Sequence, residues 1–234
     1  MRRTSSALPR PRTAFIPALR HEALTPAYDF LIRFTMPEVR FKRELIDVAA
    51  IDAGQRVLDV GCGTGTLLSM IAKRHPDALL AGVDPDPRVL QRAQRKIAQS
   101  GHSVALRQGS ATALPYAAES FDLVVSSLVF HHLTCGEKLQ AMREIHRVLA
   151  PGGELHLGDF GAPDSRAMRV VSFLTEKIGR EHVADNFAGM LMPMLEGVGF
   201  TMVEETGRLT SIFGVLRTIR AFKPRTRRSQ ERDS

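Results

Sequence analysis

Cysteine is scarce in this sequence, and so are the long apolar runs that membrane and secreted proteins carry. Only Cys62 and Cys135 are present, too few for a disulfide framework and without the further ligands that a zinc site needs. We therefore expect two free thiols, no metal site and a cytoplasmic protein. The apolar stretches fall far short of the roughly 18 to 20 residues of a membrane helix, and no apolar core follows the initial Met-Arg-Arg as in a secretory signal. We expect neither a membrane span nor a signal peptide.

Acidic residues are absent from the first 20 positions, which carry five arginines. At the other end, residues 217–234 carry seven basic residues against two acids, so each end contributes +5 to a formal net charge of +7 and the middle is left at −3. We therefore expect a basic flexible arm over residues 1–20 and a basic tail over residues 224–234. Such ends can make peripheral contact with anionic headgroups or phosphates, but the net-acidic middle predicts no nucleic-acid partner.

Between these ends we expect a single domain over residues 21–223, because the chain length and a hydrophobic content of 44% suit one globular core. Short apolar runs alternate there with segments of helical periodicity. The predicted strands are residues 57–60, 79–83, 104–106, 121–126 and 155–159, the predicted helices are residues 65–74, 86–100 and 137–149, and a turn is predicted at Pro151-Gly152-Gly153. This alternation indicates a doubly wound α/β fold with a mostly parallel sheet covered on both faces.

The two flanks of the alternating region follow other patterns. Residues 21–50 are predicted as a helical cap, divided at Pro37 because proline breaks a helix. Residues 200–205 and 212–221 are predicted as two late strands, and the segment 207–211 between them is too short for a parallel crossover. They therefore predict an antiparallel hairpin at one side of a seven-stranded sheet.

The segment from Asp59 to Gly65 combines the end of an apolar strand, an acid and three glycines at every second position. Glycine lets the backbone turn sharply and approach a ligand, and the N-terminus of the following helix presents free N–H groups. A nucleotide-type ligand suits such a crevice, outside the carboxyl ends of parallel strands. The dinucleotide fingerprint would have its third glycine at the position of Thr66, and no Gly-Lys-Ser/Thr of a Walker loop follows. The segment is therefore neither of those two motifs.

Asp84 follows the second predicted strand, 19 residues after Gly65. A carboxylate at that position can accept hydrogen bonds from both hydroxyls of a ribose. An acid after a strand often caps the next helix instead, but Asp86 followed by Pro87 is the better N-cap candidate here. We therefore expect Asp86 to cap the helix and Asp84 to serve the ligand.

Several motifs along the chain share the spacing of a known enzyme family. They are the Asp59 to Gly65 loop, Asp84, the run Gly109 to Pro115 leading into Phe121 to Val125, His131-His132-Leu133, and Arg147 to Gly153. On these motifs the chain resembles the class I S-adenosylmethionine-dependent methyltransferases over residues 25–224. Within that class it is most similar to the ubiquinone/menaquinone C-methyltransferase group, including Tyr28-Asp29 and Gly199-Phe200. The resemblance implies a Rossmann-like methyltransferase fold and S-adenosyl-L-methionine as cofactor.

The resemblance also implies roles for individual residues. The glycine loop would lie against the methionine part of the cofactor, Asp84 would bind the ribose, and Tyr28 would cover the site as an aromatic lid. The implied cofactor-binding residues are Tyr28, Asp59, Gly61, Cys62, Gly63, Gly65, Asp84, Pro85, Ser110, Ala111 and Ser127. Ser110 departs from the family pattern, because an acid commonly contacts the adenine amino group at that position. A weaker hydroxyl or backbone contact is expected in its place.

Methyl transfer from a sulfonium is an in-line displacement, so the protein mainly aligns the acceptor and excludes water. If the acceptor is a hydroxyl or an acidic ring carbon, a base helps, and His131 or His132, just past the fourth strand, are the candidates. Either histidine could instead cap the loop or pack beneath the cofactor. Asp159 closes the fifth strand at the same edge and could orient the acceptor or a histidine, or simply form a turn.

The acceptor pocket is expected in the variable parts of the fold, here residues 20–45 and an acceptor-side insertion over residues 160–195. The insertion offers an adaptable apolar surface suited to an apolar or aromatic acceptor, although such a helix face is more often core. Its apolar residues are Met168, Met190, Met192, Met194, Phe173, Phe187 and Leu191. We therefore predict methyl transfer to a small quinone-like, phenolic or lipid acceptor by a monomer or homodimer.

Three other functions are weighed against this one. A nicotinamide-dependent reductase is disfavoured by Thr66 and by the absence of a Tyr-x-x-x-Lys pair. A non-catalytic module that holds S-adenosylmethionine is disfavoured by the intact glycine loop. A nucleic-acid methyltransferase is disfavoured by the missing Asn-Pro-Pro-Tyr-type motif and by the net-acidic middle.

Overall fold

The computed structural model describes residues 38–177 and 181–225. The predicted basic arm, the first part of the helical cap with Tyr28, and most of the basic tail lie outside these ranges. Helix α2 (Glu38–Ala49) is the described part of the cap and begins directly after Pro37. Its buried residues recur at helical spacing, which gives the helix one apolar face. They are Phe41, Leu45, Ile46 and Ala49.

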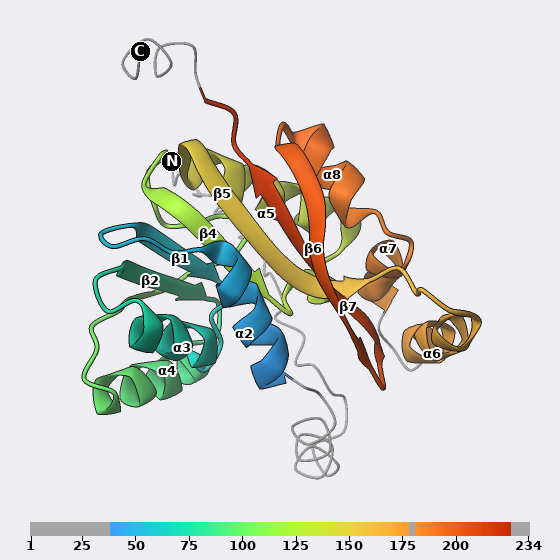
Figure 1. The fold of residues 1–234 in the computed structure, drawn as a ribbon, viewed down its shortest axis with the longest axis horizontal. Helices are drawn as coiled ribbons and strands as arrows, with labels where there is room; N and C mark the ends of the chain where they lie inside the picture. Colours follow the sequence, from blue (N-terminus) through green and yellow to red (C-terminus); the bar gives the residue numbers. More distant parts are fainter. Residues whose placement is uncertain (1–37, 178–180, 226–234) are drawn as a thin grey trace, which may run out of the picture. The chain divides into compact units, whose positions relative to one another are not determined.

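Seven strands of the described ranges form one sheet in the order β3-β2-β1-β4-β5-β7-β6 (Figure 1). The strands are β1 (Arg56–Val60), β2 (Leu79–Asp84), β3 (Ala105–Gln108), β4 (Phe121–Ser127), β5 (Leu149–Gly161), β6 (Thr201–Ser211) and β7 (Gly214–Phe222). Strands β1 to β5 pair in parallel, and β7 is antiparallel to both β5 and β6. The doubly wound, mostly parallel fold with an antiparallel hairpin at one side of the sheet is confirmed.

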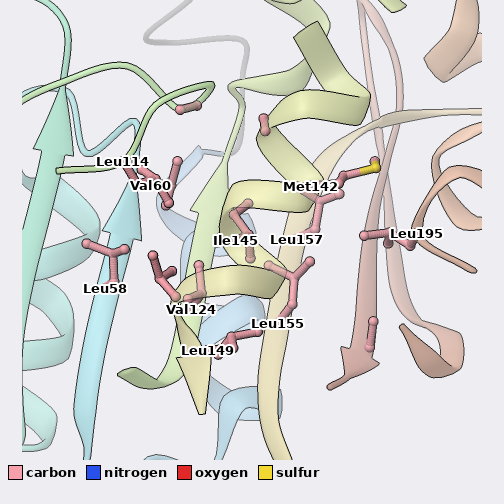
Figure 2. Close-up of a cluster of buried hydrophobic side chains, with 14 of the residues drawn as sticks. Leu58, Val60, Leu114, Val124, Met142, Ile145, Leu149, Leu155, Leu157 and Leu195 are labelled. Carbon is pink, nitrogen blue, oxygen red and sulfur yellow. The ribbon is translucent and has the colours of Figure 1, made fainter. Parts of the chain in front are cut away.

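Helices cover both faces of the sheet. Besides α2 they are α3 (Thr66–Arg74), α4 (Pro87–Gln99), α5 (Cys135–Val148), α6 (Arg166–Lys177), α7 (Ala184–Phe187) and α8 (Leu191–Val198), with the short 3-10 helices η1 (Phe130–His132) and η2 (Glu181–Val183). Helices α2, α3 and α4 share one core with Val57 and Val125. Helices α5 and α8 share the other with Leu58 and Val124, and Figure 2 shows Ile145 of α5 in that cluster. Alternate residues of β1 and β4 therefore enter opposite cores.

Side-chain caps fix the starts of two helices. Asp86 accepts a hydrogen bond from the Arg88 N–H at 2.8 Å, and Pro87 is the first residue of α4, so the predicted N-cap is confirmed. Thr134 and Glu137 form a reciprocal capping box at the start of α5. The segment between β4 and α5 carries both candidate histidines, and this cap fixes where that segment ends.

The predicted turn at Pro151-Gly152-Gly153 is wrong, because these residues belong to β5. The register between β4 and β5 shifts between Phe121 and Leu123, so the segment forms a bulge, and Gly152 has a φ of 82° there. The bulge is held by the residue that follows β7: the Gly152 N–H donates to the Lys223 carbonyl, and the Lys223 N–H donates to the Gly153 carbonyl, both at 2.9 Å.

The hairpin turn lies later in the chain than predicted. Residues 207–211 belong to β6, and the turn is Ile212-Phe213. The Ser211 hydroxyl closes the turn, since it donates to the Gly214 carbonyl at 2.7 Å and accepts from the Phe213 N–H at 3.2 Å. Strand β6 pairs with β7 alone, and a glycine-containing polar run at such an edge resembles a loop in sequence.

The strand order reverses between β1 and β4, because the chain proceeds from β1 outward to β3 and then adds β4 on the other side of β1. Ligands of doubly wound sheets bind outside the carboxyl ends of the strands at this switch point. Residues 61–65 follow β1 there and residues 128–134 follow β4. The fold thus brings the predicted glycine loop and the predicted histidines to one edge of the sheet.

Candidate active site

The three predicted glycines form a tight loop between β1 and α3. Gly61, Gly63 and Gly65 have φ values of 75°, 52° and 72°, which side chains rarely tolerate. The Gly61 and Cys62 N–H groups donate to the Val83 carbonyl at 2.8 and 3.0 Å, which fixes the loop against the end of β2. A Cβ on Gly61 would overlap the Val129 side chain. The loop therefore needs glycine for both its backbone conformation and its close packing.

Asp84 anchors this loop from the neighbouring strand. Its carboxylate accepts from the Gly63 N–H at 2.9 Å and from the Asp86 N–H at 3.0 Å. Burial raises the pKa of Asp84, and these two hydrogen bonds oppose the rise only in part. The sequence did not predict this structural role. Each carboxylate oxygen keeps a second lone pair, so the group can still accept from a ligand hydroxyl.

Two buried polar atoms lie unsatisfied beside the glycine loop. Asp59 opposes Val125 across β1 and β4, two residues before Ser127, so the Asp59 and Ser127 side chains emerge on the same face of the sheet. Asp59 is 2% exposed and Ser127 is 9% exposed. Asp59 Oδ2 and Ser127 Oγ find no hydrogen-bond partner among the described residues. Such groups are rare unless a ligand or water completes them, so this pair suits a bound molecule with donor groups at its polar end.

The electrostatics of Asp59 indicate what kind of group belongs next to it. Burial raises the pKa of Asp59 to about 7, and the Asp84 charge acts in the same direction. The Lys42 ammonium of α2 opposes this rise and is paired with Glu38 at 2.6 Å. A cationic ligand group would relieve the cost of ionising Asp59. The sequence did not single out Lys42, because nothing marks a lysine of a surface helix as facing a strand.

We predict that Asp59→Asn is more stable than the wild type at pH 8, by up to about 4 kcal/mol for a pKa raised by about three units. The folded Asp59 keeps its proton up to about pH 7, while the unfolded group ionises near pH 4. The contribution of Asp59 to the free energy of unfolding is therefore fully present below pH 4, and it is lost as the pH rises from 4 to 7. Urea unfolding at pH 4, 6 and 8 measures the difference.

Asp52→Asn, at an exposed acid just before β1, is the matched control and should unfold like the wild type at every pH. Asp59→Asn should also bind S-adenosylmethionine more weakly, because an amide attracts a cation less than a carboxylate does. A wild type whose stability does not fall between pH 4 and 7 would contradict the prediction.

The predicted adenine-side residues lie next to Asp84. Asp84 opposes Gln108 in the ladder of β2 and β3, and the Gln108 side-chain amide donates to the Pro85 carbonyl at 3.1 Å. The Gly109 N–H donates to the Asp84 carbonyl at 3.1 Å. The hydroxyl of exposed Ser110, where the family commonly has an acid, lies 2.8 Å from the Thr112 hydroxyl. Ala111 is 9% exposed.

Cys62 can offer only its backbone to a ligand. Its side chain is buried in the core beneath the loop. A Cβ on Gly82 would lie 3.0 Å from the Cys62 sulfur, so the thiol occupies the space that this glycine leaves. Burial, together with the Asp59 and Asp84 charges, raises the pKa of the thiol. The side chain is therefore an unreactive packing group.

His131 and Asp159 form a buried pair on the other side of the switch point. His131 Nδ1 lies 2.9 Å from Asp159 Oδ1, and the two residues are 6% and 1% exposed. Asp159 also accepts from the Phe130 N–H at 2.7 Å and the Phe160 N–H at 2.8 Å. Burial alone would raise the pKa of Asp159, but the His131 charge and these hydrogen bonds outweigh it and keep the pKa below its ordinary value. Asp159 is therefore an ionised carboxylate.

An ionised carboxylate only accepts hydrogen bonds, so His131 Nδ1 must carry the proton. Nε2 is then the ring nitrogen that is left to exchange a proton with an acceptor. His132, which is exposed, lies beside it with 3.9 Å between ring centroids. Asp159 lies within β5, so the alternative of a turn at this residue is wrong. Its carboxylate is hydrogen-bonded to His131.

The methionine-rich stretch of the insertion contributes less to an acceptor surface than predicted. Leu191 and Met194 of α8 are buried in the core shared with α5, and Met192 packs against it. Phe187 packs on Phe160 with 6.0 Å between ring centroids, and Phe160 in turn contacts His131 at 5.1 Å. Phe173 and Met190 are 58% and 41% exposed. Only part of the predicted surface therefore faces outward.

Two further buried polar residues near the pair were missed in the sequence. Asn186 of α7 donates through Nδ2 to Asp159 Oδ1 at 3.3 Å. Lys138 of α5 is fully buried and binds η2 and α7 through His182 and Asp185. The only available signal was a lysine at helical spacing with the apolar residues Ala141 and Met142.

The described ranges also contain a cavity away from the predicted site residues. An open cavity of about 400 Å³ lies at the amino edge of the sheet, lined by Ala49, Ala50, Asp52, Gln55, Asp122, Leu123 and residues 150–154. Within residues 38–177 and 181–225 no cluster of three or more histidine, cysteine, aspartate or glutamate side chains could hold a metal ion. Nor does any helix in those ranges have the length and apolar character to cross a membrane.

A family model described as "Methyltransferase domain" matches residues 57–153, which include the glycine loop, Asp84 and both histidines. The chain is 36% identical over 150 residues to a demethylmenaquinone methyltransferase from Thermus thermophilus, covering 63% of this chain and 67% of that protein. It is 31% identical over 148 residues to the protein of the same name from Listeria monocytogenes, of which it covers 61%, less than two thirds.

Solved structures share the fold at lower sequence identity. The YcgJ protein from Bacillus superposes with a TM-score of 0.67 at 19% identity, over 80% of this chain and 100% of that chain. A phosphoethanolamine N-methyltransferase from Haemonchus contortus, in complex with S-adenosyl-L-methionine, gives a TM-score of 0.67 at 16% identity, over 85% of this chain and 56% of that chain. At these identities the likeness concerns the fold alone.

Proposed function

The chain belongs to the class I S-adenosylmethionine-dependent methyltransferases, of the quinone methyltransferase type, and from this we propose that it methylates a ring carbon of a small reduced quinone. Its cofactor is S-adenosylmethionine. The observation that carries the acceptor proposal is the buried His131–Asp159 pair at the switch point. The relatives named demethylmenaquinone methyltransferase support the same class of acceptor.

The residues of the switch point fit the cofactor. The unsatisfied Asp59 Oδ2 and Ser127 Oγ suit the polar methionine end, Asp84 has lone pairs for the ribose hydroxyls, and Ser110 lies where the adenine edge is expected. When bound, the cofactor supplies a methyl group on a sulfonium that is already activated for displacement. The protein therefore needs to hold it, exclude water and activate the acceptor.

The His131–Asp159 pair supplies that activation. A quinol hydroxyl placed at His131 Nε2 transfers its proton to the imidazole, and the electron pair left on oxygen is delocalised to the adjacent ring carbon. Asp159 stabilises the imidazolium that forms and keeps the ring oriented. With a cofactor held by the glycine loop and Asp84, the activated ring carbon would take the methyl group that the cofactor supplies, its hydrogen would leave as a proton to solvent, and His131 would return its proton to the quinol oxygen. The buried Phe160 ring packs edge-on against the His131 imidazole, and Phe187 packs on Phe160, so the pair has an aromatic setting.

We predict that the purified protein methylates 2-prenyl-1,4-naphthoquinol under anaerobic conditions and transfers nothing above background to phosphoethanolamine. A phosphate headgroup would need cationic partners, whereas the proposed pair offers one imidazole in an aromatic setting. Transfer of an isotope-labelled methyl group, followed by mass spectrometry of the products, measures this.

The oxidised naphthoquinone is the matched control, because it has no hydroxyl proton for His131 to remove and should not react. Methylation of phosphoethanolamine alone would overturn the acceptor class. Binding of S-adenosylmethionine with no transfer to any quinol or phenol would favour the non-catalytic binding module.

A further inference from the structure

A charged side chain lies inside the helical layer next to the active site. Lys138 of α5 is fully buried, and its ammonium donates to the His182 carbonyl at 2.5 Å and to Asp185 Oδ2 at 3.1 Å. Burying an ammonium is costly even when it is paired, and an apolar residue of similar volume often serves stability equally well. Packing alone therefore does not account for a lysine at this position.

The residue after Asp185 connects this lysine to the active site. Asn186 is fully buried, and its Nδ2 donates to Asp159 Oδ1 at 3.3 Å. The same Asp159 oxygen accepts from His131 Nδ1 at 2.9 Å. In the described part of the chain, Asn186 is the one side chain besides His131 that is hydrogen-bonded to Asp159. A continuous chain of contacts thus runs from Lys138 through α7 to the base.

Helix α7 cannot hold Asn186 in place by itself. It comprises only Ala184–Phe187, and a helix of one turn is unstable without outside contacts. Apolar contacts come from Val183 and Phe187, which pack with Phe160. Apolar contacts are non-directional, however, and a hydrogen bond at 3.3 Å depends on the position of the amide. The Lys138 ammonium, bound both to the chain at His182 and to Asp185, supplies a directional anchor one residue away.

We propose that Lys138, Asp185 and Asn186 form a positioning relay that holds the Asp159 carboxylate on His131 Nδ1 and so keeps Nε2 directed at the acceptor. The relay rests on the proposed role of His131 as the base. None of its three members needs to touch substrate or cofactor. Its effect is on the orientation and tautomer of the imidazole.

The first test reads the tautomer directly, without an acceptor. In protein labelled with 15N at histidine, the His131 signals are assigned by their loss in His131→Ala. Wild-type His131 is expected to be the Nδ1–H tautomer throughout. Asn186→Leu and Lys138→Met are expected to give a mixture of both tautomers. Asp185→Asn keeps an oxygen that can accept from the Lys138 ammonium but weakens this contact by removing the charge, so it should give the same mixture in a protein that circular dichroism shows to be folded.

The second test measures turnover with 2-prenyl-1,4-naphthoquinol. The three variants are expected to lower kcat about 10-fold to 100-fold, as small misplacements of a catalytic group do, with the Kd for S-adenosylmethionine unchanged. Combining Asn186→Leu with His131→Ala should add nothing to the loss from His131→Ala alone, because the relay acts only through that ring. Arg143→Met, which removes an exposed charge from the same helix, is the matched control and should match the wild type.

A wild-type tautomer in both Asn186→Leu and Asp185→Asn overturns the relay, whatever happens to kcat, because a purely structural role would lower turnover without changing the tautomer. Additive losses in the double variant overturn it as well. If the wild type fails to methylate the quinol, the proposed acceptor is wrong, and the tautomer measurement still decides the relay.

Discussion

Replacing His131 by alanine is expected to lower kcat for quinol methylation by about 100-fold to 10,000-fold, the range that a positioned general base contributes. The acceptor hydroxyl would then have to lose its proton to water, and the buried Asp159 carboxylate would lose one of its two side-chain partners. The Kd for S-adenosylmethionine should stay close to that of the wild type, because the glycine loop and Asp84 are untouched. Steady-state kinetics and calorimetric titration separate these two effects.

His132→Ala is the matched control for this variant. His132 is the neighbouring ring, 3.9 Å away between centroids, but it is exposed, and Asp159 is hydrogen-bonded to His131. We expect a loss of less than about 10-fold, because an exposed residue outside the pair contributes less than the proposed base. A large loss in His132→Ala with nearly normal turnover in His131→Ala would reverse the assignment of the base.

Most of the fold follows from the alternation of apolar runs and helical periods. Buried parallel strands are short continuous apolar runs, as in β1 and β4, and they stand out between amphipathic helices. The first part of β6 was predicted as a strand, but residues 207–211 were predicted as a loop, because β6 is an edge strand with an intermediate or exposed side chain at nearly every position and contains Gly207. The β5 bulge was not predicted, because its pairing involves Lys223, more than 60 residues later.

In the candidate site too, residues placed by local motifs could be predicted from the sequence, and contacts between distant segments could not. Local motifs bring Gly61, Gly63, Gly65 and Asp84 together, because each follows directly from a strand end. Asp159 could be predicted as a residue of that edge with a histidine among its possible partners. The contact with His131 in particular could not be predicted, because two strand ends meet only through the sheet register.

Lys138 and Asn186 show the limit of sequence analysis more clearly. Lys138 lies on α5 and contacts a carbonyl 44 residues later, and no local pattern reports such a contact. A buried lysine in an apolar helix face is visible in sequence only as a break in amphipathicity. Surface lysines produce the same break far more often. The structure is therefore needed to distinguish a relay from a solvated side chain.

Asp84→Ala is expected to weaken S-adenosylmethionine binding by at least about 100-fold, since hydrogen bonds to a charged group contribute about 1.5 to 3 kcal/mol each. The variant loses the proposed acceptor for the ribose hydroxyls. It also releases the Gly63 N–H, which Asp84 holds at 2.9 Å, so the glycine loop must be ordered again when the cofactor binds. Calorimetric titration with S-adenosylmethionine measures the change in Kd.

Two control variants separate the contributions to that loss. Asp86→Ala removes the α4 cap and should cost about 1 kcal/mol of stability, yet leave the Kd nearly unchanged, because the Asp86 side chain bonds to Arg88 and not to the loop. Asp84→Asn keeps one acceptor oxygen and should fall between Asp84→Ala and the wild type. Wild-type affinity in Asp84→Ala would mean that the loop alone binds the cofactor and that Asp84 only anchors backbone. Weakened binding in Asp86→Ala would mean that the affinity for S-adenosylmethionine depends on the stability of α4, because that variant leaves both acceptor oxygens of Asp84 in place.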